Sequence, residues 1–179
     1  MAKILSGKEV AAALKEDLLK RVAALKDNGV TPTLAIVRVG EKESDIAYEK
    51  GAMKKSETLG IAVKNVILPA DVEEAKLIAA IEELNDAKDV HGVLLFRPLP
   101  EHLNYDRVCN TLIAEKDIDA MTTINSGLVY DGSEDGFPPC TAQAVMEILD
   151  YYLFWLQKFF LYPNIFAILA LFLLDYILS

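Results

Sequence analysis

Apolar and polar positions along residues 1–150 alternate in a way that predicts strands separated by helices. Helical periodicity appears first, where apolar side chains recur at three- and four-residue steps between Gly7 and Gly29. Short apolar, β-branched runs have the length and composition of strands buried in a parallel sheet, and they lie near residues 33–39, 62–68 and 91–96. Strands that alternate with helices predict a three-layer α/β domain, with a parallel sheet and helices on both faces.

The stretch between the first two strands has the features of a binding site. Gly40 ends the first strand, and a helical stretch with an aromatic residue and several amines follows, ending at Gly60. Ser44 and Asp45 are candidate N-caps of this helix, because a short side-chain oxygen can accept a free backbone N–H. In open α/β sheets ligands bind beyond the carboxyl ends of the strands. Tyr48 is therefore a candidate contact, although this stretch alone favours half-buried packing for Tyr48 and a solvated face for the lysines.

The pattern after the second strand predicts shorter elements. Asp71 is expected to cap a third helix, and two prolines in the run RPLP end the third strand. A short helix is expected from Tyr105 to Ala114. Asn125-Ser126-Gly127 reads as a loop, and Thr141 is expected to cap the next helix.

Composition limits the classes of partner. The net charge is −9, from 18 basic and 27 acidic residues, which argues against nucleic-acid binding because that function needs a basic face. Two cysteines and two histidines stand isolated, so their spacing predicts no metal site. Free thiols are typical of a reducing compartment, which favours the cytoplasm.

The composition changes abruptly at Tyr151. Ten of the fifteen aromatic residues lie from there onward, and only Lys158 and Asp175 are charged. The chain is therefore divided into a domain at residues 1–150 and a hydrophobic, helical tail at 151–179.

Three interpretations of the tail remain open. The uncharged stretch 159–174 has 16 residues, just short of a membrane span, and Pro163 interrupts it. A second interpretation is a hydrophobic helix docked on the domain. The third, which we favour, is a reading-frame slip just after Tyr152, because the change falls inside a helix rather than at a linker.

Four motifs occur in an order that resembles a known family. They are VGEKESDIAY, GVLLFRPLP, EKDIDA and PPCTAQAV. Together they resemble the N-terminal catalytic domain of the bifunctional methylenetetrahydrofolate dehydrogenase/methenyltetrahydrofolate cyclohydrolases, over about residues 1–150. The resemblance implies one-carbon folate metabolism: oxidation of methylenetetrahydrofolate, then cyclohydrolysis of the methenyl form to 10-formyltetrahydrofolate.

The family's working residues carry over only in part. The resemblance implies that Tyr48 packs on the folate ring system, that Asp119 holds the pterin, and that a loop lines the pocket, formed by Pro98, Leu99 and Pro100. The family's lysine falls on Ala52 and its glutamine on Phe96. Two of the four polar working residues are therefore replaced, and the glycine of the KDxDG turn is replaced by alanine.

Three cations are candidate substitutes. Lys55 lies seven residues after Tyr48, so it returns to about the same helix face, roughly 10 Å along the axis. Lys54 aligns with a second family lysine, and Arg97 follows the third strand. A cation there would polarise the ligand, and a lysine could also act as a base. Ordinary surface charge is the alternative for each of them.

The family also implies a cofactor and a partner. Its second, Rossmann-type domain supplies NADP, and its intact members are expected to be homodimers. No glycine-rich turn between strand and helix follows Thr141, so we identify no cofactor-binding residues in this chain. Two classes of function remain: a folate enzyme domain, or a non-catalytic or tail-anchored folate-binding protein on the same scaffold.

Overall fold

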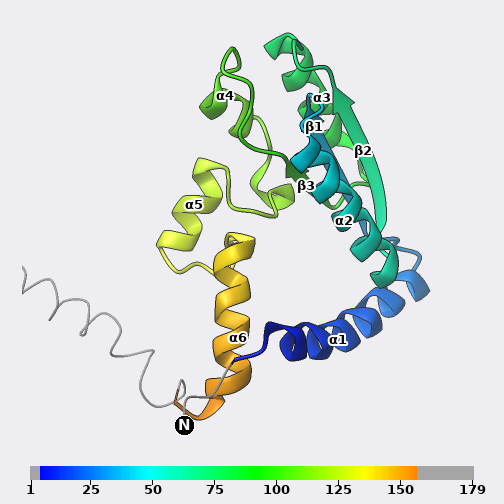
Figure 1. The fold of residues 1–179 in the computed structure, drawn as a ribbon, viewed down its shortest axis with the longest axis vertical. Coiled ribbons are helices and arrows are strands. Elements are labelled where there is room, and N and C mark those ends of the chain that lie inside the picture. The colour runs from blue at the N-terminus through cyan, green and yellow to red at the C-terminus, as the bar shows by residue number, and fades with distance from the viewer. Residues whose placement is uncertain (1–4, 157–179) are drawn as a thin grey trace, which may run out of the picture. The chain divides into compact units, whose positions relative to one another are not determined.

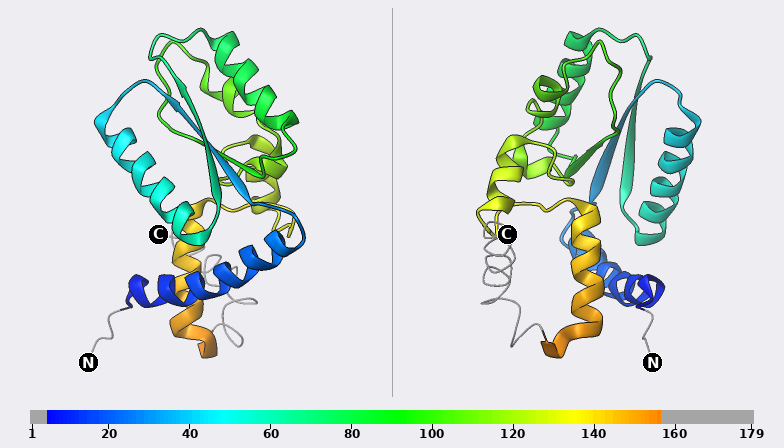
Figure 2. Two further views of the ribbon diagram at one scale, coloured as in Figure 1. Left: turned by 90° about the vertical axis from the view of Figure 1, so that its right-hand side faces the viewer. Right: turned by 60° about the vertical axis from the view of Figure 1, so that its left-hand side comes forward.

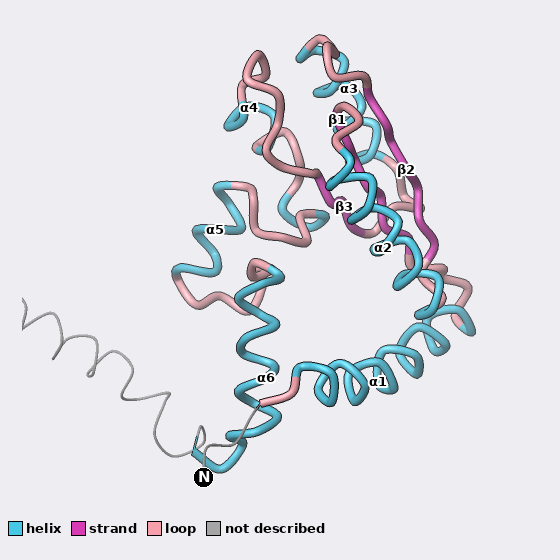
Figure 3. Tube along the Cα trace, in the orientation of Figure 1, coloured by secondary structure: helices cyan, strands magenta, loops and turns pink. Residues whose placement is uncertain are grey.

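The structure is a computed structural model that describes residues 5–156. It divides into a larger unit, Ala13–Cys140, and a smaller one that combines Met1–Ala12 with Thr141–Ser179. Figures 1 and 3 show the elements of the chain. In chain order they are α1 (Gly7–Asp27), β1 (Thr33–Val39), α2 (Glu43–Leu59), β2 (Ala62–Leu68), α3 (Glu74–Asp86), β3 (Gly92–Leu95), α4 (Tyr105–Cys109), η1 (Ala114–Lys116), α5 (Thr123–Tyr130) and α6 (Cys140–Leu156).

The larger unit is built on a three-stranded parallel sheet in the order β2-β1-β3. Val37 of the central strand pairs with Val66 on one side and Leu95 on the other. The parallel α/β fold and the positions of the three strands are therefore confirmed. The β1 run is short and apolar because β1 is buried along most of its length, as parallel strands are. The edge strand β2 is mostly exposed, so its expected burial is wrong.

The side chains of β1 point alternately to the two faces of the sheet. One set packs with the apolar side of α3 in the main core cluster, which includes Ala35, Val37, Val39, Leu77, Ile81 and Leu84. On the other face Arg38 reaches Glu49 of α2. Figure 2 shows α2 and α3 on opposite sides of the strands. Because successive side chains of a strand point to opposite faces, one short strand can contact both α2 and α3.

Three expected helix starts are wrong by two or three residues. Glu43 begins α2 after Lys42, so Ser44 and Asp45 lie inside the first turn instead of capping it. Glu74 begins α3, three residues after Asp71. The chain before it forms a turn, in which the Val72 N–H donates to the Pro69 carbonyl. Thr141 likewise lies inside α6. Acidic residues suit a first turn as well as a cap, because they oppose the helix dipole there.

The region after β3 is more helical than the sequence pattern suggests. The expected Tyr105–Ala114 helix stops at Cys109, and the expected loop at 125–127 is the middle of α5. Thr122 caps α5 by accepting the Asn125 N–H, and the buried Asn125 amide donates to two carbonyls outside the helix, at 3.0 Å each. These tertiary bonds outweigh the loop preference of an Asn-Ser-Gly run.

Gly60 and Ala120 are two of the five residues with positive φ between residues 5 and 156. Gly60 ends α2 at φ 75°, as expected of a glycine C-cap. Ala120 has φ 49°, the only non-glycine residue with a positive φ between residues 5 and 156. A Cβ in the left-handed region costs roughly 1–2 kcal/mol.

Ala120→Gly is expected to raise the free energy of unfolding by about 1 kcal/mol, because it relieves the left-handed strain. Chemical denaturation measures this change. Ala87→Gly is the matched control: Ala87 has φ −68°, so glycine there gains nothing and adds flexibility. Equal effects of the two substitutions would contradict the assignment of strain to Ala120.

The smaller unit is described over residues 5–12 and 141–156. The Tyr152 hydroxyl donates to Glu9 Oε2 at 2.7 Å and accepts the Ser6 N–H at 3.1 Å. No helix within residues 5–156 has the length and apolar character needed to cross a membrane. The predicted boundary at residue 150 falls inside α6, and the apolar stretch 159–174 lies outside the described residues.

Candidate functional site

The candidate site lies at the carboxyl edge of β1 and β3, within the larger unit. The Phe96 N–H donates to the Val37 carbonyl at 2.9 Å, so the chain leaves β3 level with the end of β1. Beyond β3, Asp117 forms an isolated parallel bridge to Val93. Since Asp119 and Leu95 each lie two residues past that bridge, both point toward the same edge. The parallel register thus brings three distant segments to one place.

A cavity of about 480 Å³ opens at this edge. Its walls come from the first two turns of α2, the end of β3 with the two residues after it, and Asp119. The lining residues are Ser44, Asp45, Tyr48, Leu94, Leu95, Phe96, Arg97 and Asp119. The Tyr48 and Phe96 rings meet edge to face, with centroids 5.4 Å apart. Tyr48 is 64% exposed, so its ring is available to a ligand.

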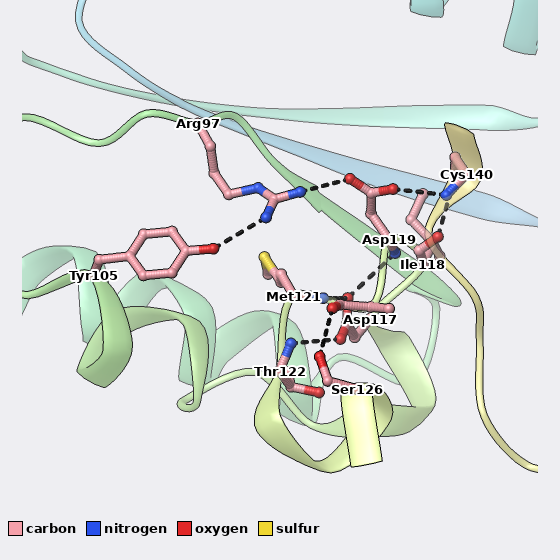
Figure 4. A network of polar contacts seen from close by, with 10 residues as sticks. Arg97, Tyr105, Asp117, Ile118, Asp119, Met121, Thr122, Ser126 and Cys140 are labelled. Carbon is pink, nitrogen blue, oxygen red and sulfur yellow. Dashed lines mark hydrogen bonds and ion pairs between the residues drawn. The ribbon is translucent and has the colours of Figure 1, made fainter. Parts of the chain in front are cut away.

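Arg97 and Asp119 form one polar side of the cavity. Figure 4 shows the contacts that hold these two side chains. Arg97 donates to Asp119 Oδ2 at 2.7 Å and to the Tyr105 hydroxyl at 3.0 Å. The second carboxylate oxygen of Asp119 accepts the Cys140 backbone N–H at 2.8 Å. Hydrogen bonds within the protein therefore orient the Arg97 and Asp119 side chains without a bound ligand.

Two pKa shifts follow from these contacts. The Tyr105 hydrogen bond and the Asp119 charge raise the pKa of the Arg97 guanidinium, so Arg97 stays charged and cannot act as a base. Burial and the nearby Asp119 charge raise the pKa of the Cys140 thiol, whose Sγ donates to the Ile118 carbonyl at 3.2 Å. The thiol is therefore a hydrogen-bond donor and not an activated nucleophile.

In the Lys-Asp-x-Asp run, Lys116 and Asp117 hold the loop in place, whereas Asp119 lines the cavity. Lys116 donates to three carbonyls at the C-terminal end of α3, each at 2.7 Å. Asp117 is fully buried and accepts the backbone N–H groups of Asp119, Met121 and Thr122. Burial alone would raise the pKa of Asp117, but these hydrogen bonds outweigh it and the pKa is lowered. Lys116 and Asp117 thus hold the loop that carries Asp119.

A buried ion pair attaches α2 to the sheet beside the cavity. Arg38 Nε donates to Glu49 Oε2, and both side chains are less than a tenth exposed. Asn65 on β2 donates to the other oxygen of Glu49 at 3.2 Å. Glu49 follows Tyr48 directly, so this pair fixes the helix turn that carries the cavity's exposed ring.

The structure brings together only some of the residues singled out from the sequence. Tyr48, Arg97 and Asp119 line the one cavity. Leu99 is half-buried against the α3 core, and neither Pro98 nor Pro100 is among the lining residues. The substrate-binding role of the Pro-Leu-Pro loop stays a prediction.

The two lysines on α2 lie away from this cavity. Lys54 lines a separate cavity of about 680 Å³ beside β2, and Lys55 is exposed and lines neither one. Within residues 5–156 neither lysine has an ion-pair partner. Their catalytic role stays a prediction.

Sequence reasoning missed Asp45 and Tyr105 as parts of the site and Asp117 as its support. Asp45 precedes Tyr48 by three residues, so helical spacing could have placed both on one face. An aspartate that begins a loop commonly accepts nearby backbone N–H groups, which was the available signal for Asp117. Tyr105 had no such signal, because its contact with Arg97 depends on the path of the loop between them.

The chain matches a family model described as the tetrahydrofolate dehydrogenase/cyclohydrolase catalytic domain over residues 5–119. Among curated proteins it is 45% identical, over 152 residues, to the bifunctional protein FolD of Alkaliphilus metalliredigens. It is 46% identical over 152 residues to that of Carboxydothermus hydrogenoformans. The alignments cover 85% of this chain and 54% and 53% of those proteins, so the chain spans about half the length of the relatives it matches.

Solved structures of two enzymes with related names also superpose on this chain. The bifunctional FolD enzyme of Campylobacter jejuni superposes with a TM-score of 0.82 at 35% identity, covering 84% of this chain and 53% of that one. The Trypanosoma brucei methylenetetrahydrofolate dehydrogenase-cyclohydrolase, complexed with NADP cofactor and inhibitor, gives 0.78 at 28% identity, covering 84% and 52%.

Proposed function

The chain belongs to the tetrahydrofolate dehydrogenase/cyclohydrolase family, and from that membership we propose that it binds a tetrahydrofolate derivative in the cavity at the edge of β1 and β3. The reaction served is oxidation of methylenetetrahydrofolate and cyclohydrolysis of the methenyl form to 10-formyltetrahydrofolate. One observation carries the proposal. Tyr48, Arg97 and Asp119 come from three separate segments, and all three line one cavity with an exposed aromatic ring.

Each of these residues has a definite task in the proposal. The Tyr48 ring packs on the flat folate ring system, where a large contact area excludes water. Asp119 holds the pterin by accepting its N–H groups, and Arg97 fixes the orientation of that carboxylate. Pro98, Leu99 and Pro100 border the ligand. NADP, bound outside the residues assigned here, would supply the hydride acceptor.

The residues that line the cavity include no lysine or histidine that could transfer a proton. Arg97 remains charged, and the family's lysine and glutamine positions hold Ala52 and Phe96. Lys54 and Lys55 are the proposed bases, and either needs a rearrangement of α2 or of its own side chain to reach the cavity. This observation favours a second candidate function, a non-catalytic folate-binding protein on the same scaffold.

The proposal extends to the setting of the chain. We place it in the cytoplasm, as a homodimer when its full family architecture is present. Residues 1–150 are the folate-binding domain in this account. The segment 151–179 is a hydrophobic tail, from a frame slip rather than membrane attachment.

Tyr48→Ala is expected to weaken binding of a tetrahydrofolate analogue by about tenfold or more, because it removes the exposed ring of the cavity. Calorimetric titration of the full chain measures the dissociation constant. Tyr130→Ala is the matched control, since Tyr130 is 91% exposed on α5 and lines no part of the cavity. Equal losses in the two variants, or no binding by the unsubstituted chain, would overturn the proposed site.

A further inference from the structure

A second carboxylate lines the cavity from α2. Asp45 lies one turn before Tyr48 on the same helix face and is half-buried. Its Oδ1 accepts the Ser44 hydroxyl at 3.2 Å. In the part of the chain that the structure describes, no lysine, arginine or histidine lies within ion-pair distance of it. Asp119, by contrast, is paired with Arg97 at 2.7 Å.

The lining therefore carries an uncompensated negative charge. It contains two carboxylates, Asp45 and Asp119, and one guanidinium, Arg97, which leaves a net charge of minus one. The guanidinium is committed to Asp119 and Tyr105. Tyr48 and Phe96 add two aromatic rings, and aromatic faces also attract cations. A planar, positively charged ring system is the ligand that this lining suits best.

Among the folate forms of the proposed function, one has this charge. The methenyl form carries a delocalised positive charge on its N–CH–N bridge, whereas the methylene and formyl forms are neutral there. We propose that Asp45 makes the cavity selective for the cationic methenyl form over the neutral forms, an inference that rests on the proposed folate-binding function. Ala52, one turn after Tyr48, adds no ammonium group that would oppose a bound cation.

The selectivity has a consequence for turnover. Opening of the methenyl ring to the formyl product removes the positive charge, so the attraction of Asp45 is lost when the product forms. An interaction present with the cation and absent with the neutral product favours release of that product. Asp45 is a specificity-determining residue in this account, and no proton transfer is assigned to it.

The experiment compares dissociation constants of the full chain for a cationic and a neutral ligand. The ligands are 5,10-methenyltetrahydrofolate, mixed rapidly with the chain at neutral pH before its ring opens, and 5-formyltetrahydrofolate, which is neutral at the one-carbon bridge. The unsubstituted chain is expected to prefer the methenyl form by about tenfold, as one partly solvated charge pair would give. Asp45→Asn should abolish that preference by weakening methenyl binding alone, and Asp45→Glu should keep it.

Glu43→Gln is the matched control, because Glu43 also lies in the first turn of α2 but does not line the cavity. Its preference should equal that of the unsubstituted chain. The preference should also shrink as salt is added, a test that needs no substitution. An unchanged preference in Asp45→Asn, or equal affinities in the unsubstituted chain, overturns the selectivity while leaving folate binding intact. Failure to bind either ligand overturns both proposals.

Discussion

Asp117→Ala is expected to lower the free energy of unfolding by about 3–5 kcal/mol. The carboxylate is fully buried and accepts three backbone N–H groups, at 3.2, 3.1 and 2.9 Å. Alanine leaves one buried and two part-buried donors without an acceptor, and this loss causes most of the destabilisation. Denaturant titration measures the loss. Asp131→Ala is the control, since Asp131 is exposed at the end of α5 and should cost little.

The pH dependence of stability tests the same residue independently. The pKa of Asp117 is lowered in the folded chain, so its stabilisation is fully present above the unfolded value of about 3.9. It is lost as the pH falls through the lower, folded value. The unsubstituted chain should therefore lose more stability on acidification than Asp117→Ala does. A loss below about 1 kcal/mol in the variant, with parallel acid profiles, would contradict the supporting role of Asp117.

Arg38→Met alone is expected to cost about 3–5 kcal/mol, because it leaves the Glu49 carboxylate buried without its partner. The double variant Arg38→Met/Glu49→Leu should recover most of this loss, since apolar side chains of similar volume replace a buried pair at little cost. Denaturant titration of both variants gives the two free energies. If the pair also orients Tyr48, the double variant will be stable yet bind the folate analogue more weakly.

A surface pair provides the comparison. Lys20 and Glu16 form an ion pair at 3.0 Å with side chains 73% and 75% exposed. Lys20→Met should change stability by less than about 1 kcal/mol, because solvent screens the pair. Equal costs for Arg38→Met and Lys20→Met would show that the Arg38–Glu49 pair is not buried as described.

Local patterns predicted most of the sheet but not the helix starts. The β-branched run at β1 is short and apolar because both faces of the strand are covered, so periodicity alone could locate it. The starts of α2 and α3 were wrong because several neighbouring side chains, such as Ser44 and Asp71, are equally good caps. Lys42 and Glu73 occupy the N-cap positions without a side-chain capping bond, so no local signal marked them.

The site was predictable in part from the family motifs and in part from strand ends. Tyr48 and Asp119 were found by resemblance, and Arg97 by its place after the third strand. Their meeting follows from parallel register, which sequence does not give directly. The buried Asn125 illustrates the limit. The hydrogen bonds of its side chain reach residues 8 to 12 positions away, outside α5, so a local pattern predicted a loop there. Long-range hydrogen bonds of this kind decide the structure after β3.

An amide chemical-shift map of the full chain, titrated with a tetrahydrofolate derivative, tests whether folate binds at the edge of β1 and β3. Saturable shifts are expected around Tyr48, at Phe96 and Arg97, and around Asp119, with little change on α3. Absence of saturable shifts, or shifts confined to α3 and its face of the sheet, would contradict it.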